Sequence, residues 1–557
     1  MSLVARTFTL GLLATTLFAC GENSSGEKNT FKDFPAVGQQ LVYTPDDRLF
    51  NREAPIPPQC YTKTEQRYNP CYVCHQAYTK DTHAAYRMNK LDDAALQGTY
   101  LFSDIGMNNQ WQNLFEDRQD YVNNISDSAI LDYINTDNYN PLRQHLKENN
   151  WQGYLPDLAH YANPQQAFSE NGLAKDGSHW VAFNYKPFPS TFWPTNGSTD
   201  DVIIRLPAAF YQHDGHDDPS IYWLNLSLLE MSIQSLDTIS VPPFNEVHYQ
   251  IDINGDKKFD TAVDQLVYQG YYFGDAKDQA VTPQQYPLGT EFLHSVRYVG
   301  VSEAGDIGPS TRMKELRYMK KIRSLSESEI DNRYRRERKE KVDEELPYFV
   351  NHRDQGMDNN FGWMLTGFIE DAQGSLRPQT TEETMACMGC HSAIGSTIDQ
   401  TFAFGRKVTG REGWGYIDLK GMPDAPNLNS DQPEILDYLK RVGGGDEFRQ
   451  NQEMQARWFN ADGSLKLAEI KQADVYQLIT PSPERALQLN KAYTHLVRTQ
   501  RFIFGRDANW LPAENVLKTV DESIAPLNAE HRVRGWDIRL NWPSTSAQKT
   551  TQETVAR

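Results

Sequence analysis

The sequence predicts an α+β protein in which mainly helical regions with many loops flank a β-rich module. The chain has 557 residues, more than a single hydrophobic core accommodates, so we expect several domains. From Val202 to Tyr298, β-branched and aromatic residues alternate with turn signals, a pattern typical of strands. On both sides of this span, capping residues precede short cysteine-containing segments and predict helices there.

We place the domain boundaries where composition and turn signals change. The expected parts are a leader (1–19), a flexible tether (20–35), a first helical region (36–199), the β-rich module (200–300), a second helical region (301–445) and a helical C-terminal region (446–557). Within the second region, we predict helix from Met313 to Leu346, with a restart at a capping box between Ser326 and Glu329.

The composition is that of an acidic globular protein. Hydrophobic residues make up 39% and charged residues 23% of the chain, and the formal net charge is −19. These proportions are typical of a chain that folds into compact units. The negative charge argues against nucleic acid as a partner. It suits encounters with basic redox proteins, and it serves solubility equally well.

The N-terminus has the layout of a cleavable secretory leader. Met1 to Arg6 are weakly basic, and Thr7 to Ala19 form an apolar stretch too short to span a bilayer. Leu17-Phe18-Ala19-Cys20 resembles the bacterial lipobox, which implies cleavage before Cys20 and attachment of a lipid to it. An ordinary leader with an incidental cysteine is the alternative.

We expect this lipid to be the membrane anchor. The residue after Cys20 is Gly21 and not Asp. By the same resemblance, this fits sorting to the outer membrane, with the body facing the periplasm or the cell surface. No later segment is long and apolar enough for a transmembrane helix.

Four of the six cysteines form two Cys-x-x-Cys-His motifs. The first motif is Cys71-Tyr72-Val73-Cys74-His75, and the second is Cys387-Met388-Gly389-Cys390-His391. Residues at i, i+3 and i+4 share one face of a helix, so each motif presents two thiols and an imidazole together. Asn69-Pro70 predicts a helix start before the first motif, and a capping box between Thr380 and Glu383 predicts one before the second.

Each motif matches the haem c attachment pattern. A thioredoxin-like redox pair or half of a zinc site would also use Cys-x-x-Cys. Two copies with the histidine, in a chain with an export leader, favour haem. The motifs and their immediate helices resemble those of c-type cytochromes. The resemblance implies two covalently bound haem c groups, with thioethers at Cys71, Cys74, Cys387 and Cys390 and proximal iron ligands at His75 and His391.

The second axial ligand of each haem would decide between a carrier and a catalyst. Met107 and Met422 are candidate distal ligands, because each follows a glycine in an Asp-containing stretch after one of the motifs. Met422-Pro423 resembles the ligand loop of class I cytochromes. Packing in the core is the commoner role of a methionine. His83, His352 and Met357 are the alternatives.

Cys60 belongs to neither motif. With Cys20 lipidated and four cysteines bound to haem, it would be an intermolecular link, a buried inert residue or a reactive thiol. A more specific alternative is that the Cys60 thiolate binds haem iron, as in thiosulfate-oxidising cytochromes. A buried inert cysteine is the commoner case.

The β-rich module contains a candidate calcium loop. Oxygen-bearing residues recur at alternate positions around a glycine, as in D-x-[DN]-x-D loops; they are Asp252, Asn254, Asp256 and Asp260. The EF-hand pattern fails because its twelfth position is Val263 instead of Glu. Asn254-Gly255 is equally a hairpin signal, so a calcium site and a plain turn both remain open.

The leader and the motifs together predict a diheme lipoprotein that carries electrons between periplasmic or surface redox proteins. No catalytic residue is assigned. The alternative is a haem enzyme, either a diheme peroxidase or a thiol or thiosulfate oxidoreductase, which the length of the chain and Cys60 favour. The motifs lie much farther apart than the diheme peroxidases place them. A binding module with accessory haems is a third alternative.

Overall fold

The computed structural model describes residues 30–38, 50–76, 94–190, 193–343, 345–428, 430–445, 447–448 and 450–543. The leader, Cys20 and His83 lie outside the described residues, as does most of the tether.

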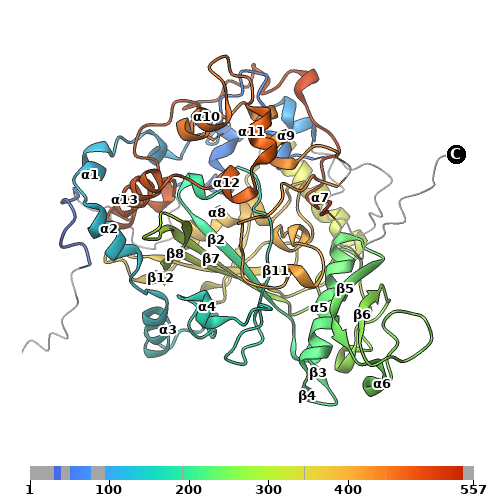
Figure 1. The fold of residues 1–557 in the computed structure, drawn as a ribbon. Coiled ribbons are helices and arrows are strands. Elements are labelled where there is room, and N and C mark those ends of the chain that lie inside the picture. The colour runs from blue at the N-terminus through green and yellow to red at the C-terminus, as the bar shows by residue number, and fades with distance from the viewer. Residues whose placement is uncertain are drawn as a thin grey trace, which may run out of the picture.

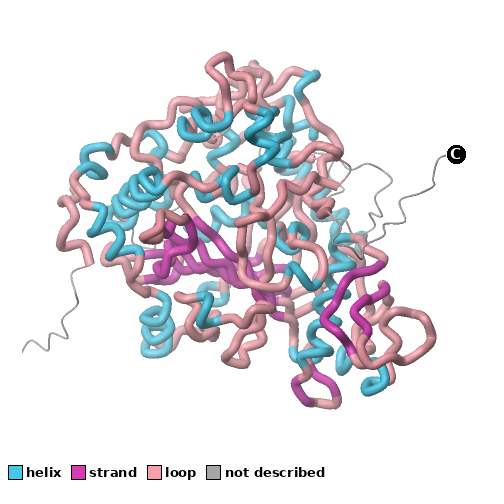
Figure 2. Tube along the Cα trace, viewed as in Figure 1, coloured by secondary structure: helices cyan, strands magenta, loops and turns pink. Residues whose placement is uncertain are grey.

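An antiparallel sheet of eight strands forms the centre of the molecule (Figures 1 and 2). The strand order is β1-β2-β7-β8-β11-β10-β9, and β12 pairs with β11. The bounds are β1 (Val181–Ala182), β2 (Thr199–Arg205), β7 (Glu291–Val301), β8 (Ile307–Lys321), β9 (Val350–Asn351), β10 (Met357–Asp358), β11 (Trp363–Glu370) and β12 (Leu376–Pro378). Two smaller sheets pair β3 (Gln212–His213) with β4 (His216–Asp217) and β5 (Thr238–Phe244) with β6 (Val263–Val267).

Helices surround this sheet. In Figure 1, α3 and α4 lie below it and α9 to α13 above it. The helices are α1 (Gln119–Asn123), α2 (Asp127–Ile134), α3 (Tyr139–Glu148), α4 (Pro164–Ala167), α5 (Pro219–Gln234), α6 (Glu246–Tyr249), α7 (Glu327–Val342), α8 (Thr381–His391), α9 (Glu434–Val442), α10 (Gln452–Trp458), α11 (Leu467–Gln472), α12 (Val475–Ile479) and α13 (Pro483–Thr499).

The two faces of the sheet have different neighbours, because successive side chains of a strand point to opposite faces. On one face, Leu293 of β7 and Leu316 of β8 pack in a hydrophobic cluster with Leu142 of α3. On the other face, His294 of β7 is paired with Arg317 of β8. Side chains on this second face line a cavity described below.

The prediction of mainly helical regions around the two motifs is wrong. The sheet takes strands from Val181 to Pro378, and the span from Met313 to Lys321, predicted as helix, belongs to β8. Pairing with β7 and β11 on both sides overrides the helix-forming residues of this span. The predicted restart at Ser326 is confirmed, because α7 begins at Glu327 and Ser326 and Glu329 exchange capping hydrogen bonds. The domain boundaries remain predictions.

A group of buried charges fastens the C-terminal part to the core. Arg406 donates to both carboxylate oxygens of Glu434 in α9, and Lys186 Nζ lies 3.0 Å from Glu434 Oε2. All three side chains are buried. Burial alone would raise the pKa of Glu434, but Arg406 and Lys186 outweigh it and hold the pKa at about 2.

Replacing this carboxylate tests the network. Because the folded-state pKa of Glu434 is depressed, its contribution is fully present above about pH 4.5 and is lost as the pH falls towards about 2. We expect Glu434→Gln to lower the free energy of unfolding at pH 7 by ~3–5 kcal/mol, the cost of breaking a buried pair. Thermal unfolding across pH should also show a shallower acid dependence than in the unchanged chain. The exposed Glu530→Gln is the control, and equal effects of the two substitutions would contradict the assignment.

Helix α8 packs closely against a distant part of the chain. A Cβ atom placed on Gly389, inside the second motif, would lie 2.1 Å from the carbonyl oxygen of Pro55. This carbonyl belongs to the segment that precedes the first motif. Glycine is therefore required by the approach of two backbones rather than by the helix.

Replacing Gly389 with alanine distinguishes the effect of helix propensity from the effect of the close contact with Pro55. In an open helix Gly→Ala would stabilise the fold by about 1 kcal/mol, whereas the clash with Pro55 should make Gly389→Ala destabilising by ~1–3 kcal/mol. Denaturant unfolding measures the sign. Gly270→Ala, with nothing within 4 Å of the added Cβ, is the matched control and should change stability little. A more stable Gly389→Ala protein would mean that the two segments do not touch.

Candidate functional site

The second motif occupies the end of α8. Thr380 Oγ1 accepts a hydrogen bond from Glu383 N, and Glu383 Oε2 accepts one from Thr380 N, so the predicted capping box is confirmed. The helix then carries Cys387, Cys390 and His391 at i, i+3 and i+4, on one face.

Hydrogen bonding fixes the tautomer of His391. Its Nδ1 lies 2.8 Å from the carbonyl oxygen of Gln400. A carbonyl only accepts, so Nδ1 carries the hydrogen and Nε2 of the neutral ring keeps its lone pair. Burial lowers the pKa of His391 to about 4, and His294 and Arg317 act in the same direction. The ring is therefore neutral at pH 7. A histidine that donates its other ring nitrogen to a backbone carbonyl is the usual arrangement of a metal ligand.

The first motif starts in a single 3₁₀ turn, Cys71–Val73, rather than in the expected α-helix. Asn69 Oδ1 accepts from Tyr72 N at 3.0 Å, as an N-cap would. His75 N donates to Cys71 O at 2.8 Å, which closes one helical turn across the motif. The local geometry still brings both thiols and the imidazole together.

Two adjoining cavities lie at the motifs. The first, of about 270 Å³, is lined by Cys71, Cys74 and His75. The second, of about 320 Å³, is lined by Cys387 and His391. Both linings are mainly apolar, and the volumes are close to the lower end of the range for cofactor pockets. The residues that line both cavities are Gln59, Phe188, Cys390 and Phe402. Two motifs far apart in the sequence thus meet at one shared wall.

Side chains of the sheet line the second cavity together with α8. The residues from three neighbouring strands are Asp200 and Val202 from β2, Phe292, His294 and Val296 from β7, and Lys314, Glu315, Arg317, Tyr318 and Met319 from β8. On β2 and β7 these are alternate residues, as the pleat requires. The cavity is therefore built jointly by a helix and by paired strands.

One thiol of each motif is held in its protonated form. Burial raises the pKa of Cys71 to about 12 and that of Cys390 to about 11, and Cys387 adds to the latter shift. Neither of these two thiols has the lowered pKa of a reactive thioredoxin-like cysteine. Nor do the described residues contain a group of three His, Cys, Asp or Glu side chains that would hold a metal ion such as zinc.

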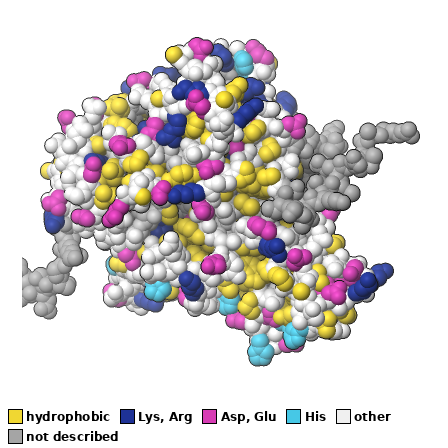
Figure 3. All heavy atoms as spheres, viewed as in Figure 1, with side chains coloured by type: hydrophobic (Ala, Val, Ile, Leu, Met, Phe, Trp, Pro, Cys, Tyr) yellow, Lys and Arg dark blue, Asp and Glu magenta, His cyan; other side chains and the backbone are white. Residues whose placement is uncertain are grey.

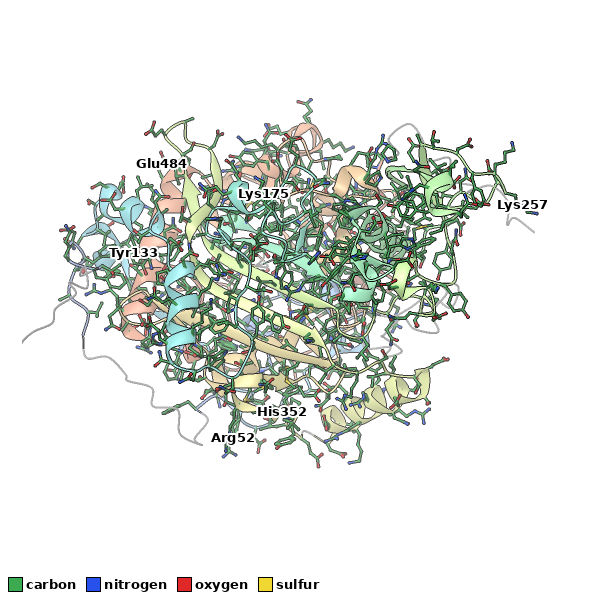
Figure 4. The ribbon with its side chains drawn as sticks, turned by 90° about the horizontal axis from the view of Figure 1, so that it is seen from below. Arg52, Tyr133, Lys175, Lys257, His352 and Glu484 are labelled. Carbon is green, nitrogen blue, oxygen red and sulfur yellow. The ribbon has the colours of Figure 1, made fainter. Side chains whose placement is uncertain are left out.

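Neither predicted distal methionine lines the cavities at the motifs. Met422 lines a separate cavity with Asn184 and Trp542. Met107 lines neither cavity at the motifs; its backbone N–H donates to Ser103 O and its carbonyl accepts from Val520 N. Of the alternatives, His352 precedes a 3₁₀ turn, near the molecular edge in Figure 4, and Met357 is in β10; neither lines these cavities.

The candidate calcium loop is held by its own backbone. Asp252 accepts from the N–H groups of Gly255 and Lys257, and Asp256 accepts from Lys258 N. Asn254 accepts from Asp256 N, and Asp260 N donates to Glu246. Lys257 extends outward in Figure 4. Such contacts form in a plain turn and in a calcium loop alike, so the calcium site stays a prediction.

Two residues at the cavities had little or no sequence signal. Cys60 lines the first cavity. Its only signal in the sequence is that it belongs to neither motif. His294 lines the second, and its position in β7 was hidden inside an alternating strand pattern. The surface seen in Figure 3 carries interspersed acidic and basic side chains, so on this face the net charge does not form one patch.

Comparison with known proteins gives a family. A lipoprotein family model matches residues 46–476. An uncharacterized lipoprotein of Aquifex aeolicus is 31% identical over 559 residues, which cover 90% of this chain and 91% of the relative. No solved structure matches. None of the helices that the described residues form is long and apolar enough to span a bilayer.

These matches correct the resemblance drawn from the motifs. Classification among the c-type cytochromes is wrong, because both matches are to lipoproteins and neither is to a cytochrome c family. The matches likewise give no support to haem, iron or electron transfer. The reason is that a five-residue motif can be carried by unrelated folds. The chain belongs to this lipoprotein family, and it is thereby an exported protein attached to a membrane through a lipid.

Proposed function

We propose that each Cys-x-x-Cys-His motif holds one covalently bound haem group and that this lipoprotein carries electrons between exported redox proteins. The observation that carries the proposal is the meeting of the two motifs at adjoining apolar cavities with a common wall. A structural role for the motifs would not require a cavity at either one.

The residues at the cavities fit such a group. Two thiols of a motif line each cavity and could form thioethers there, and burial raises the pKa of Cys71 and Cys390. His391 presents the lone pair of Nε2 because Gln400 binds Nδ1. The aromatic rings of Phe188 and Phe402 lie at both cavities and exclude water. The chemistry that haem supplies when bound is one-electron transfer.

The shared wall supports a relay within one chain. Cys390 of the second motif also lines the first cavity, and Gly389 beside it contacts Pro55 of the segment that enters the first cavity. Groups held by the two motifs would be neighbours. The contact between the backbones at Gly389 fixes their relative position, which a carrier with two centres needs.

A haem enzyme is the second candidate. The observation that favours it is the presence of polar side chains: His294, Arg317 and Asp200 line the second cavity together with His391, and Cys60 lines the first. Polar groups beside an open iron position would suit a peroxidase or a thiol oxidoreductase. Binding of carbon monoxide by the reduced protein, without added ligand, would favour the enzyme.

We place the protein at the outer membrane, anchored by a lipid on Cys20. This placement rests on Gly21 after the cysteine in place of Asp. A redox protein held there would meet partners in the periplasm or at the surface, and its net charge of −19 suits basic ones.

Intact mass is the direct test. The full chain, produced in a bacterium with the haem c maturation machinery, should exceed its processed polypeptide mass by two haem groups. The variants Cys71→Ala/Cys74→Ala and Cys387→Ala/Cys390→Ala should each lose one group, because each removes both thioethers of one site. Cys60→Ala is the control and should keep both. A wild-type mass with no haem would overturn the proposal.

A further inference from the structure

One wall of the second cavity contains a histidine that the sequence motifs do not account for. His294 lies in the middle of β7, opposite Val202 of β2 and Arg317 of β8. Strand alternation directs its side chain to the second face of the sheet, away from its buried neighbour Leu293. On this face it lines the same cavity as His391.

The ring of His294 has an unused nitrogen. Its Nε2 is buried and makes no hydrogen bond to any described residue. Asp200 Oδ2 lies 3.3 Å away but off the hydrogen-bonding direction. A buried polar atom without a partner is costly and calls for an explanation such as a bound group.

The two histidines reach the cavity from different elements. His391 comes from α8 and His294 from β7, and both side chains line the same cavity. Other candidate ligands at this cavity are Met319, Tyr185 and Tyr493. Met319 is buried in the main hydrophobic cluster, next to Phe292 across the strands. The hydroxyls of Tyr185 and Tyr493 are also buried without a hydrogen bond, but burial raises the pKa of both phenols, which opposes the anionic form that ligates iron.

We infer that His294 is the second axial ligand of the haem held by the second motif, which makes that iron bis-histidine. The inference rests on the proposed function and adds a residue that neither the motifs nor the family description assigns. It also assigns the second centre to electron transfer, because two strong ligands leave no position for a substrate.

Spectroscopy of the full holoprotein tests this. The wild-type protein should contain low-spin iron at the second centre that does not bind carbon monoxide. In His294→Ala, one equivalent of haem per chain should become high-spin and should bind one additional carbon monoxide when reduced. Added imidazole should restore the low-spin spectrum, because it fills the space left by the ring. Met319→Leu and the distant His179→Gln are matched controls and should leave the spectrum unchanged.

Two further variants test the assignment of His294 if the first variant does not fold or if its effect is indirect. If His294→Ala does not fold, His294→Met keeps a ligand of similar size. The reduction potential of one haem should then rise, because methionine ligation raises the potential of haem iron. In the Cys387→Ala/Cys390→Ala background, His294→Ala should have no spectral effect. A protein with two haems whose spin state and carbon monoxide binding are unchanged by His294→Ala would overturn the inference alone. A mass without haem would instead overturn the proposed function.

Discussion

The alternation of side chains along β7 is the constraint on which both the fold and the site depend. Leu293 points into the hydrophobic cluster shared with α3, and His294, the next residue, points into the second cavity. A shift of register by one residue would exchange these two environments. The pairing of His294 with Val202 and Arg317, on both sides, fixes the register. The candidate site is thus built on a strand that is paired on both sides.

Features that depend on local sequence are predicted well. The capping boxes at Thr380 and Ser326 form as expected, because their hydrogen bonds involve residues only three positions apart. The span from Met313 to Lys321 was predicted as helix and is part of β8. Its residues are good helix formers, but two neighbouring strands determine its conformation, and those partners are distant in sequence.

In the candidate site, too, the features that depend on local sequence are predicted and those that depend on distant partners are not. The motifs were visible because their spacing is local, whereas the second histidine was not, because its role depends on strand register. Met422 was chosen for its distance along the chain from His391, yet it lines another cavity with Asn184 and Trp542. Distance along the chain therefore does not reveal which side chains line a cavity whose wall is formed by paired strands.

Buried ion pairs fix the charges at the second cavity. Arg317 and Arg506 both bind Glu315, whose pKa falls to about 2 despite its burial. The carboxylate therefore stays ionised at neutral pH and holds these two guanidinium groups in place. Charges held in this way are preorganised, so the haem proposed for this cavity would meet surroundings that need little reorganisation. The proposal requires a helical turn of thiols, an apolar cavity and an imidazole that lines it, and a fold built around a sheet can supply all three.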